Sequence, residues 1–184
     1  MRKVIVSEML SVDGYFSGPN GEMDWFISQD AKLDEYALEL LNTIDTIIYG
    51  EATYNLMVGF WPHAPGPFAE RTNKIEKRIV SKKLTNTPWG EWNNASPLTG
   101  DLGDEIKKLK QQDGKDIVVY GSGSIVRQLA DLGLVDEYRL IVNPVILGKG
   151  VALFGDVSHK HSLELLNATT FPSGGVALTY KPKK

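Results

Sequence analysis

The sequence predicts an α/β protein with a mostly parallel central sheet that ends in an antiparallel pair of strands. The order of patterns is the first reason, because strand-like and helix-like stretches alternate from Val4 to Leu132 and only strand-like stretches follow. The second reason is the last pair of strand-like stretches, which flank Pro172-Ser173-Gly174-Gly175 as an antiparallel pair would. Alternation of strands with helices favours parallel pairing, with the helices covering the sheet.

The chain begins with a strand and, after two turns, a helix. Val4 to Leu10 has the composition of a buried strand that runs into a turn at Ser11-Val12-Asp13-Gly14, and Gly18 to Gly21 has the composition of a loop. Apolar residues at spacing i, i+3, i+4, i+7 and i+8 then predict an amphipathic helix from Asp30 to Asn42. They are Leu33, Tyr36, Ala37, Leu40 and Leu41.

The middle of the chain repeats this alternation. A short buried strand, Thr46 to Tyr49, ends at Gly50, and Ala52 to Met57 has a helical pattern. Prolines and glycine predict a stiff loop over residues 62–67. The elements expected after it are a strand at 78–81, a loop with a short strand at 89–97, and a helix at 104–111.

The stretch from Asp116 to Leu129 is the most informative of the chain. Ile117 to Tyr120 predicts a buried strand, a glycine-serine turn follows, and apolar residues then recur at helical spacing. The strands expected after this helix are Tyr138 to Val142, Leu163 to Thr169 and Val176 to Tyr180. All elements fit one domain over residues 1–184, because the length suits a single core.

Composition excludes several classes of protein. The formal net charge is −3 with both signs spread along the chain, which argues against nucleic acid or an anionic membrane as a partner. Cysteine is absent, so disulfides, thiolate metal sites and a cysteine nucleophile are excluded. The first residues become polar at Ser7 and Glu8, too soon for a signal peptide, and a cytoplasmic protein is expected.

The glycine-serine turn after Tyr120 allows two interpretations. Its small residues leave backbone N–H groups open, and the first turn of the next helix carries partial positive charge, so the turn suits a phosphate. Alternatively it is an ordinary turn in which Ser124 caps the helix. The dinucleotide fingerprint fails because Val126 stands where glycine or alanine is needed, and no P-loop or His-Glu-x-x-His motif is present. No metal site is expected, and His159 and His161 are interpreted as a solvated loop pair.

Three strand ends share small or hydroxylated residues. They are Gly50-Glu51-Ala52-Thr53, Ser81-Lys82-Lys83 and Gly121-Ser122-Gly123-Ser124. Ligands of open α/β sheets bind outside the carboxyl ends of the strands, and two small-residue turns that open helices suit a pyrophosphate. The pair Ser81 and Lys82 suits a further phosphate, such as the 2′-phosphate of an NADP cofactor. Together these segments favour a phosphorylated cofactor.

At these residues the sequence resembles the dihydrofolate reductase superfamily, and within it the riboflavin-biosynthesis branch: the reductase domain of the bifunctional deaminase/reductase and its standalone bacterial relatives. The resemblance runs in order from the start of the chain to about Phe154. It is carried by residues 11–15, 21–25, 49–54 and 120–124, and most specifically by Leu132-Gly133-Leu134-Val135-Asp136-Glu137-Tyr138-Arg139-Leu140 and Asn143-Pro144-Val145-Ile146-Leu147-Gly148-Lys149-Gly150. The zinc ligands of the fused deaminase cannot exist in a chain without cysteine.

The resemblance implies a dihydrofolate reductase-like fold, a mostly parallel sheet flanked by helices, with NADPH lying across the strand ends, and commonly a homodimer. The cofactor-binding residues that it implies are Gly14, Gly50, Thr53, Ser81, Lys82, Gly121, Ser122, Gly123, Ser124 and Ile125. One position departs from the pattern, because Glu51 stands where dihydrofolate reductases usually have arginine after the glycine. That exchange removes a cation near the phosphates.

Hydride transfer to a carbonyl or imine also needs a proton donor near the acceptor. Asp24 beside Trp25 is the favoured acid, because partial desolvation by the indole would raise its pKa, and Asp13 is the second candidate. The alternatives are that Asp24 caps a helix beginning at Trp25 and that Asp13 forms a turn. Tyr15 and Trp25 are the predicted substrate contacts, as part of an aromatic wall with Phe16, Phe60 and Trp61 whose alternative role is core.

The function expected from these residues is an NADPH-dependent reductase acting on a small planar heterocycle. By resemblance, the substrate is 5-amino-6-(5-phosphoribosylamino)uracil of riboflavin synthesis. Two alternatives stay open: an enzyme of the same fold that reduces dihydrofolate or another carbonyl or imine compound, and a binding protein that kept the nucleotide site without turnover. A basic cluster for a ribose-phosphate is not evident in the sequence, which favours the first alternative, and Glu51 favours the second.

Overall fold

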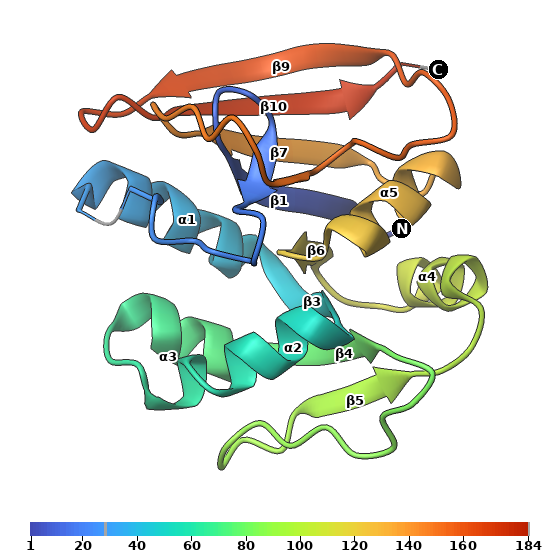
Figure 1. Ribbon diagram of the computed structural model, residues 1–184. Helices are drawn as coiled ribbons and strands as arrows, with labels where there is room; N and C mark the ends of the chain where they lie inside the picture. Colours follow the sequence, from blue (N-terminus) through green and yellow to red (C-terminus); the bar gives the residue numbers. More distant parts are fainter. Residues whose placement is uncertain (28, 184) are drawn as a thin grey trace.

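A computed structural model describes residues 1–27 and 29–183 of the chain. Its centre is an eight-stranded sheet in the order β5-β4-β3-β6-β1-β7-β10-β9, flanked by helices (Figure 1). The strands of this sheet are β1 (Val4–Leu10), β3 (Ile44–Gly50), β4 (Glu76–Val80), β5 (Ala95–Leu98), β6 (Asp116–Tyr120), β7 (Glu137–Val142), β9 (Leu163–Thr170) and β10 (Val176–Pro182). The helices are α1 (Ala31–Thr43), α2 (Glu51–Val58), η1 (Trp61–His63), α3 (Pro67–Lys74), α4 (Leu102–Gln111) and α5 (Gly123–Asp131).

The sheet is parallel from β5 to β7 and antiparallel beyond it, as predicted. β1 lies between β6 and β7 and pairs in parallel with both, and β3 pairs in parallel with β4 and β6. β10 then runs antiparallel to β7 and β9. All the carboxyl ends of the parallel strands therefore meet at one edge of the sheet, where the loops after β1, β3, β4 and β6 gather.

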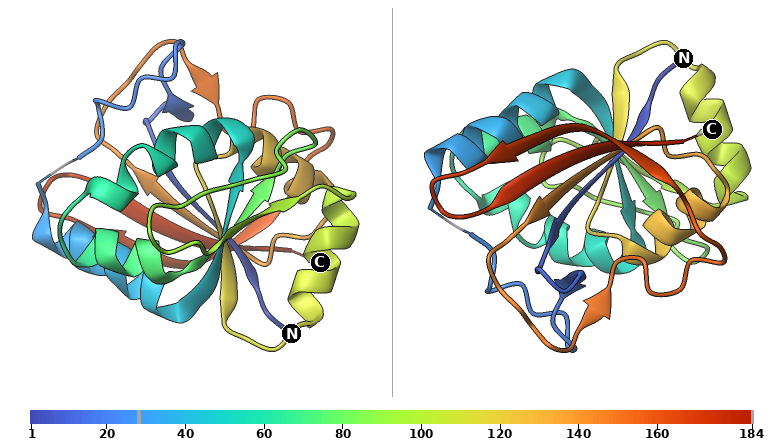
Figure 2. Two further views of the ribbon diagram at one scale, coloured as in Figure 1. Left: turned by 90° about the horizontal axis from the view of Figure 1, so that it is seen from below. Right: turned by 90° about the horizontal axis from the view of Figure 1, so that it is seen from above.

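Helices cover both faces of the sheet. Residues of α4 and α5 pack with alternate residues of β1 and β6 into one core cluster, whereas α1 and α2 pack with β3 and β4 into another. The two views of Figure 2 show the same arrangement, with α1, α2 and α3 on the side of the sheet opposite α4 and α5. Burial on both faces explains why stretches of the central strands, such as Val4–Val6 and Ile117–Val119, are apolar without alternation.

The predicted helix at Asp30 begins as the sequence indicated. The Asp30 carboxylate accepts backbone N–H groups of Lys32 and Leu33 at 3.0 and 3.2 Å, so it is the N-cap of α1. A second carboxylate oxygen of Asp30 accepts the N–H of Ser173 at 2.8 Å and ties the β9–β10 turn to the same point.

Four details differ from the sequence-based expectations. The stiff loop at 62–67 is partly helical, because Pro67 stands at the first position of α3, where proline needs no N–H partner. Ser122 is the N-cap residue of α5, not Ser124. No helix begins at Trp25 in the described residues, so Asp24 has no helix to cap. A small second sheet pairs β2 (Tyr15–Ser17) with β8 (Val151–Ala152), which were not foreseen.

Membrane insertion through a helix has no support in the described residues, because none of their helices combines the length and apolar character needed to cross a bilayer.

Candidate functional site

The carboxyl ends of β3 and β6 are joined by a chain of hydrogen bonds between hydroxyl groups. The backbone N–H of Gly50 donates to Ser122 Oγ at 2.8 Å, and Ser122 Oγ donates to Thr53 Oγ1 at 3.0 Å. Thr53 Oγ1 in turn donates to the carbonyl of Gly121 at 2.7 Å. The structure thus brings together four of the residues that the sequence assigned to a cofactor. We call this set, Gly50, Thr53, Gly121 and Ser122, the hydroxyl bridge.

The hydroxyl bridge sets two helix starts side by side. Neither Gly50, the N-cap of α2, nor Ser122, the N-cap of α5, makes a side-chain cap hydrogen bond. The N–H groups of a first helical turn have no intrahelical acceptor, so both starts present donors and partial positive charge to the same space. Such a pair of helix starts fits the phosphates of a nucleotide.

Two positions after β6 require glycine because neighbouring side chains lie close to them. Gly121 has φ +61°, and a Cβ there would lie 3.1 Å from the Thr53 methyl carbon. A Cβ on Gly123 would lie 2.6 Å from the ring of Phe16. Glycine therefore lets the β6–α5 turn pack against both α2 and the β1–β2 segment.

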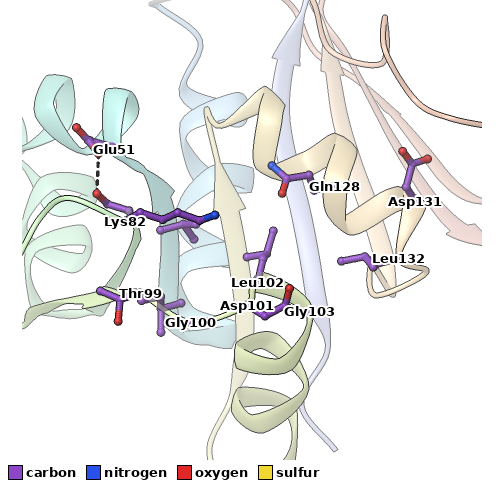
Figure 3. A pocket seen from close by; sticks show the side chains of 13 residues that line it. Glu51, Lys82, Thr99, Gly100, Asp101, Leu102, Gly103, Gln128, Asp131 and Leu132 are labelled. Atoms are coloured by element: carbon purple, nitrogen blue, oxygen red, sulfur yellow. Dashed lines mark hydrogen bonds between the residues drawn. The ribbon is translucent and has the colours of Figure 1, made fainter.

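A polar cavity of about 1010 Å³ opens beside this bridge, between the ends of β4 and β5 and the helices α4 and α5 (Figure 3). Ser81 and Lys82, which the sequence analysis assigned to a phosphate of the cofactor, line this cavity. Figure 3 shows the Lys82 side chain extending from the end of β4 toward the side formed by α5. Lys82 is the single cation among the described residues that line this cavity, which also include Glu51, Asp101 and Asp131.

Glu51 has a defined structural partner. Its Oε2 accepts a hydrogen bond from Ser81 Oγ at 2.6 Å, and Ser81 Oγ accepts the N–H groups of Lys83 and Leu84 at 3.0 Å each. The carboxylate also stands in the first turn of α2, where negative charge is favourable. Glu51, which replaces the arginine usual in dihydrofolate reductases, thus orders the loop after β4. Its carboxylate also places a negative charge where the phosphates of the cofactor are expected.

An apolar cavity of about 410 Å³ lies on the other side of the β6 end, within the range of small-molecule sites. Aromatic and aliphatic side chains from β1, α1, η1 and α3 form most of its wall. The lining residues are Ser7, Glu8, Met9, Phe16, Met23, Phe26, Ile27, Leu33, Asp34, Tyr36, Ala37, Leu40, Tyr49, Met57, Trp61, Phe68, Thr72, Tyr120, Gly121 and Ile141. Because Gly121 lines this cavity and Glu51 lines the other, the hydroxyl bridge lies between the two.

Glu8 on β1 is the most perturbed carboxyl group of the apolar cavity. Its residue is 6% exposed, and burial raises the pKa of its side chain from 4.5 to about 8. The backbone N–H groups of Gly121 and Ser122 oppose this rise in pKa but do not cancel it. Its Oε1 has no hydrogen-bond partner. At neutral pH this group therefore carries a proton, and its residue lines the apolar cavity.

The two acids named from the sequence lie elsewhere. Asp13 is exposed, and its carboxylate accepts the N–H groups of Leu147 and Gly148 at 3.1 and 2.7 Å. A hydrogen bond from Ser11, helped by these amides, lowers the pKa of Asp13. Asp24 is exposed rather than desolvated by Trp25. Neither aspartate lines the polar or the apolar cavity, so their catalytic roles stay predictions.

The predicted substrate contacts are also displaced from the cavity. Tyr15 pairs with β8, and the indole N–H of Trp25 donates to the carbonyl of Glu22 at 3.1 Å. Of the aromatic wall expected from the sequence, Phe16 and Trp61 line the apolar cavity. Gly14 turns the chain after β1 with φ +83°, and its carbonyl accepts the N–H of Leu153 at 3.2 Å. Ile125 packs into the core beneath Gly50, and Ser124 lies in the first turn of α5.

His159 and His161 meet a third residue that the sequence did not connect with them. Asp131 Oδ1 lies 3.1 Å from His161 Nε2 and 3.8 Å from His159 Nδ1. Hydrogen bonds from Ser158 and His161 lower the pKa of Asp131 to about 2. The described contacts tie the loop before β9 to the end of α5.

Sequence reasoning missed Glu8, Tyr36 and Thr72 as site residues. Tyr36 was counted as one position of an apolar helix face, and Thr72 lies in α3, where the sequence analysis assigned no element. Glu8 was a usable signal, because it stands with Ser7 between apolar residues of a predicted buried strand, and a glutamate is rarely buried unless it is paired.

Comparison with known proteins places this architecture among reductase-like folds. The chain superposes on the crystal structure of a putative riboflavin biosynthesis protein from Shewanella sp. PV-4 with a TM-score of 0.83, at 23% identity and over 99% of both chains. It also superposes on dihydrofolate reductase from Enterococcus faecalis, complexed with NADP(H) and RAB-propyl, with a TM-score of 0.68, at 13% identity, over 99% of this chain and 97% of that one. The fold is therefore dihydrofolate reductase-like, as predicted.

Sequence comparison identifies the family. The profile of the RibD C-terminal domain matches residues 2–177, and the chain belongs to that family. It is also 37% identical over 182 residues to the uncharacterized protein YyaP of Bacillus subtilis (strain 168), which covers 97% of this chain and 94% of that protein.

Proposed function

We propose that this protein is an NADPH-dependent reductase that transfers hydride to a small planar heterocycle. The observation that carries the proposal is the position of the hydroxyl bridge, between a polar cavity with Ser81 and Lys82 and an apolar cavity with aromatic walls. A dinucleotide laid across the strand ends would place its adenosine phosphate in the first cavity and its pyrophosphate over the helix starts. Its nicotinamide would then reach the second cavity, beside the substrate.

The residues of the chain bind the substrate, exclude water from it and donate a proton, whereas the cofactor supplies the hydride. The aromatic walls exclude water from the acceptor, and Tyr120 and Gly121 form the side of the cavity next to the bridge. The reduced acceptor needs a proton, and we assign its supply to Glu8, which holds one at neutral pH and lines the cavity. Asp24 is the alternative donor, and it would have to act through water because it lies outside the cavity.

The substrate that the family suggests is 5-amino-6-(5-phosphoribosylamino)uracil. A second candidate substrate class, dihydrofolate or another carbonyl or imine compound, is favoured by one observation. No lysine, arginine or histidine is found among the described residues that line the apolar cavity, so the cavity offers no cation to a ribose-phosphate.

Cofactor titration tests the proposal. We expect NADPH to bind with micromolar affinity, followed by cofactor fluorescence, and NADH to bind more weakly. Lys82→Ala should weaken NADPH binding about 10-fold or more, because a hydrogen bond to a charged group contributes about 1.5–3 kcal/mol. Lys83→Ala is the matched control, since Lys83 is exposed and does not line the polar cavity. Failure of both cofactors to bind would refute the reductase proposal.

A non-catalytic nucleotide-binding protein is the remaining alternative, and Glu51 is the observation that favours it. Its carboxylate lines the polar cavity and would repel phosphates. Glu51→Gln keeps a side-chain oxygen for Ser81 and removes the charge, so it should tighten NADPH binding. A binding protein would bind NADPH and leave it reduced whichever planar heterocycle was added. A reductase would oxidise NADPH when its substrate was added, and the near-ultraviolet absorbance of NADPH would fall.

We also propose a homodimer with a cytoplasmic location. The observation in favour of the dimer is the edge strand β9, where Leu165 and Leu166 are 52% and 48% exposed. Sedimentation of the purified protein tests the dimer, and Leu166→Lys should shift it toward monomer.

A further inference from the structure

The wall of the apolar cavity carries acidic groups without a basic one. Glu8 and Asp34 both line it, and the described lining residues include no cationic side chain. Arg139 lies near Tyr120 of this wall and opposes in part the rise that burial causes in the pKa of Tyr120, but its Nε donates to Glu137 Oε1 at 2.6 Å. A phosphate moved from water into such a wall would lose its hydration without gaining a counter-charge, which costs many kcal/mol.

Three residues that line this cavity each carry a buried polar atom without a hydrogen-bond partner: Glu8 Oε1, Tyr36 Oη and Thr72 Oγ1. They come from three different elements, β1, α1 and α3. They are three of the six such atoms in the described residues. Buried polar atoms nearly always find partners in folded proteins, so their concentration on one apolar wall indicates a ligand that provides them.

The chemistry of these atoms defines a complementary ligand. The hydroxyl groups of Tyr36 and Thr72 can each donate and accept a hydrogen bond, and a protonated Glu8 carboxyl donates one. The carbonyl oxygens of a heterocycle can accept hydrogen bonds from these groups, and its ring N–H groups can donate hydrogen bonds to the hydroxyl oxygens. Aromatic side chains such as Phe16, Trp61 and Tyr120 offer flat surfaces for its ring.

We propose that the apolar cavity binds an uncharged planar heterocycle without a phosphate group, and that Glu8, Tyr36 and Thr72 hold its polar atoms. This inference rests on the proposed function, because the cavity is where the substrate of that reductase would bind. It separates this chain from a reductase of a phosphoribosyl-pyrimidine.

The test uses lumazine as the planar probe, with uridine and uridine 5′-phosphate as a matched pair that differs in the phosphate. Binding to the NADPH-loaded protein is followed by quenching of tryptophan fluorescence, since Trp61 lines the cavity. We expect lumazine to bind, and uridine to compete with it better than uridine 5′-phosphate does. Tighter binding of uridine 5′-phosphate than of uridine would overturn the proposal, as would no binding of lumazine.

Two isosteric variants test the role of the unpartnered hydroxyl groups. Tyr36→Phe and Thr72→Val remove hydroxyls that have no partner within the protein, so both variants should fold with unchanged or greater stability. Each should nevertheless weaken lumazine binding about 3- to 10-fold, the equivalent of one net hydrogen bond. Glu39→Gln, on the exposed face of the same helix as Tyr36, is the control. Unchanged lumazine affinity in both variants would refute the assignment.

The two proposals fail separately in this experiment. Loss of the proposed function would appear as no NADPH binding in the first titration. Loss of the further inference would appear as normal NADPH binding with preference for the phosphorylated probe, or with lumazine binding that ignores Tyr36 and Thr72.

Discussion

Replacement of Glu8 by glutamine should change the pH dependence of stability in a direction that the structure fixes. Burial raises the pKa of Glu8 from 4.5 to about 8. Between these two values the unfolded chain has released the proton and the folded protein retains it. The folded state therefore binds more protons, and the free energy of unfolding falls as pH rises from 4.5 to 8.

The magnitude follows from the size of that rise. One pKa unit corresponds to ~1.4 kcal/mol, so the free energy of unfolding should fall by about 5 kcal/mol in total as pH rises from below 4.5 to above 8. About 3 kcal/mol of this fall has occurred by pH 7, because the unfolded chain has already released the proton. Glutamine has the same shape and does not ionise. Glu8→Gln should therefore match the wild-type stability near pH 4.5 and exceed it by about 3 kcal/mol at pH 7.

Urea denaturation at several pH values between 4.5 and 8.5 measures this difference directly. Glu39→Gln on the exposed face of α1 is the control, and it should follow the wild-type curve. Parallel curves for wild type and Glu8→Gln would show that Glu8 titrates normally, and the assignment of a protonated acid at the cavity would then be wrong. Asp34, Tyr36, Tyr49 and Tyr120 are the other ionisable groups that line this cavity, and Arg139 lies near Tyr120; none of them is replaced in the variant.

The remaining predictions concern the hydroxyl bridge, the buried lysine of β4 and the turn after β6. Thr53→Val removes the hydroxyl group that joins α2 to Gly121 and Ser122, and should weaken NADPH binding about 5-fold in a fluorescence titration. Lys77 has its pKa lowered to about 7 by burial, so wild-type stability should rise between pH 7 and 10.5, and this rise should vanish in Lys77→Met. Gly123→Ala places a Cβ against the ring of Phe16, and should weaken lumazine binding while Gly133→Ala, which meets no neighbour but has φ +63°, only lowers stability.

Much of the fold was predictable because it depends on local patterns. The apolar run of β6 and the helical spacing of α1 each specify one element without help from distant residues. The helix α3 was not predictable in this way, because its buried positions are Ala69, Thr72 and Asn73 rather than large apolar residues. Asn73 is buried because its side chain bonds Trp61 and Trp89. Only the folded structure brings those tryptophans to the helix.

The candidate site was half visible in the sequence. The small residues at the strand ends predicted the hydroxyl bridge, since each strand end that it joins has its own glycine and hydroxyl residues. The apolar cavity carries no such signal, because its wall joins β1, α1 and α3, which are far apart in the chain. Asp24 was chosen for its neighbour Trp25, but a turn leaves that pair at the surface, where the indole does not desolvate the carboxylate.

The two most perturbed ionisable groups outside the tyrosines, Glu8 and Lys77, show how a structural charge differs from a functional one. Lys77 is fully buried, yet its Nζ donates to the carbonyl of Asn73 at 2.7 Å and to Asn94 at 3.4 Å, and lies 4.4 Å from the ring centre of Trp89. Every side of that ammonium is occupied by protein, so no ligand is needed to explain it. Glu8 is also withdrawn from water, but its Oε1 has no hydrogen-bond partner and the residue lines the apolar cavity.

A ligand should therefore act on one of these groups and leave the other unchanged. A heterocycle that accepts a hydrogen bond from Glu8 stabilises its protonated form and raises its pKa further, whereas the partners of Lys77 stay as they are. By linkage, uridine, whose ring stays largely uncharged on both sides of pH 8, should bind more tightly below pH 8 than above it in the wild type, and with equal affinity at both in Glu8→Gln. The same change of pH should leave uridine binding in Lys77→Met indistinguishable from wild type. A pH dependence that survived in Glu8→Gln would assign the titrating group elsewhere and leave Glu8 with a role in folding alone.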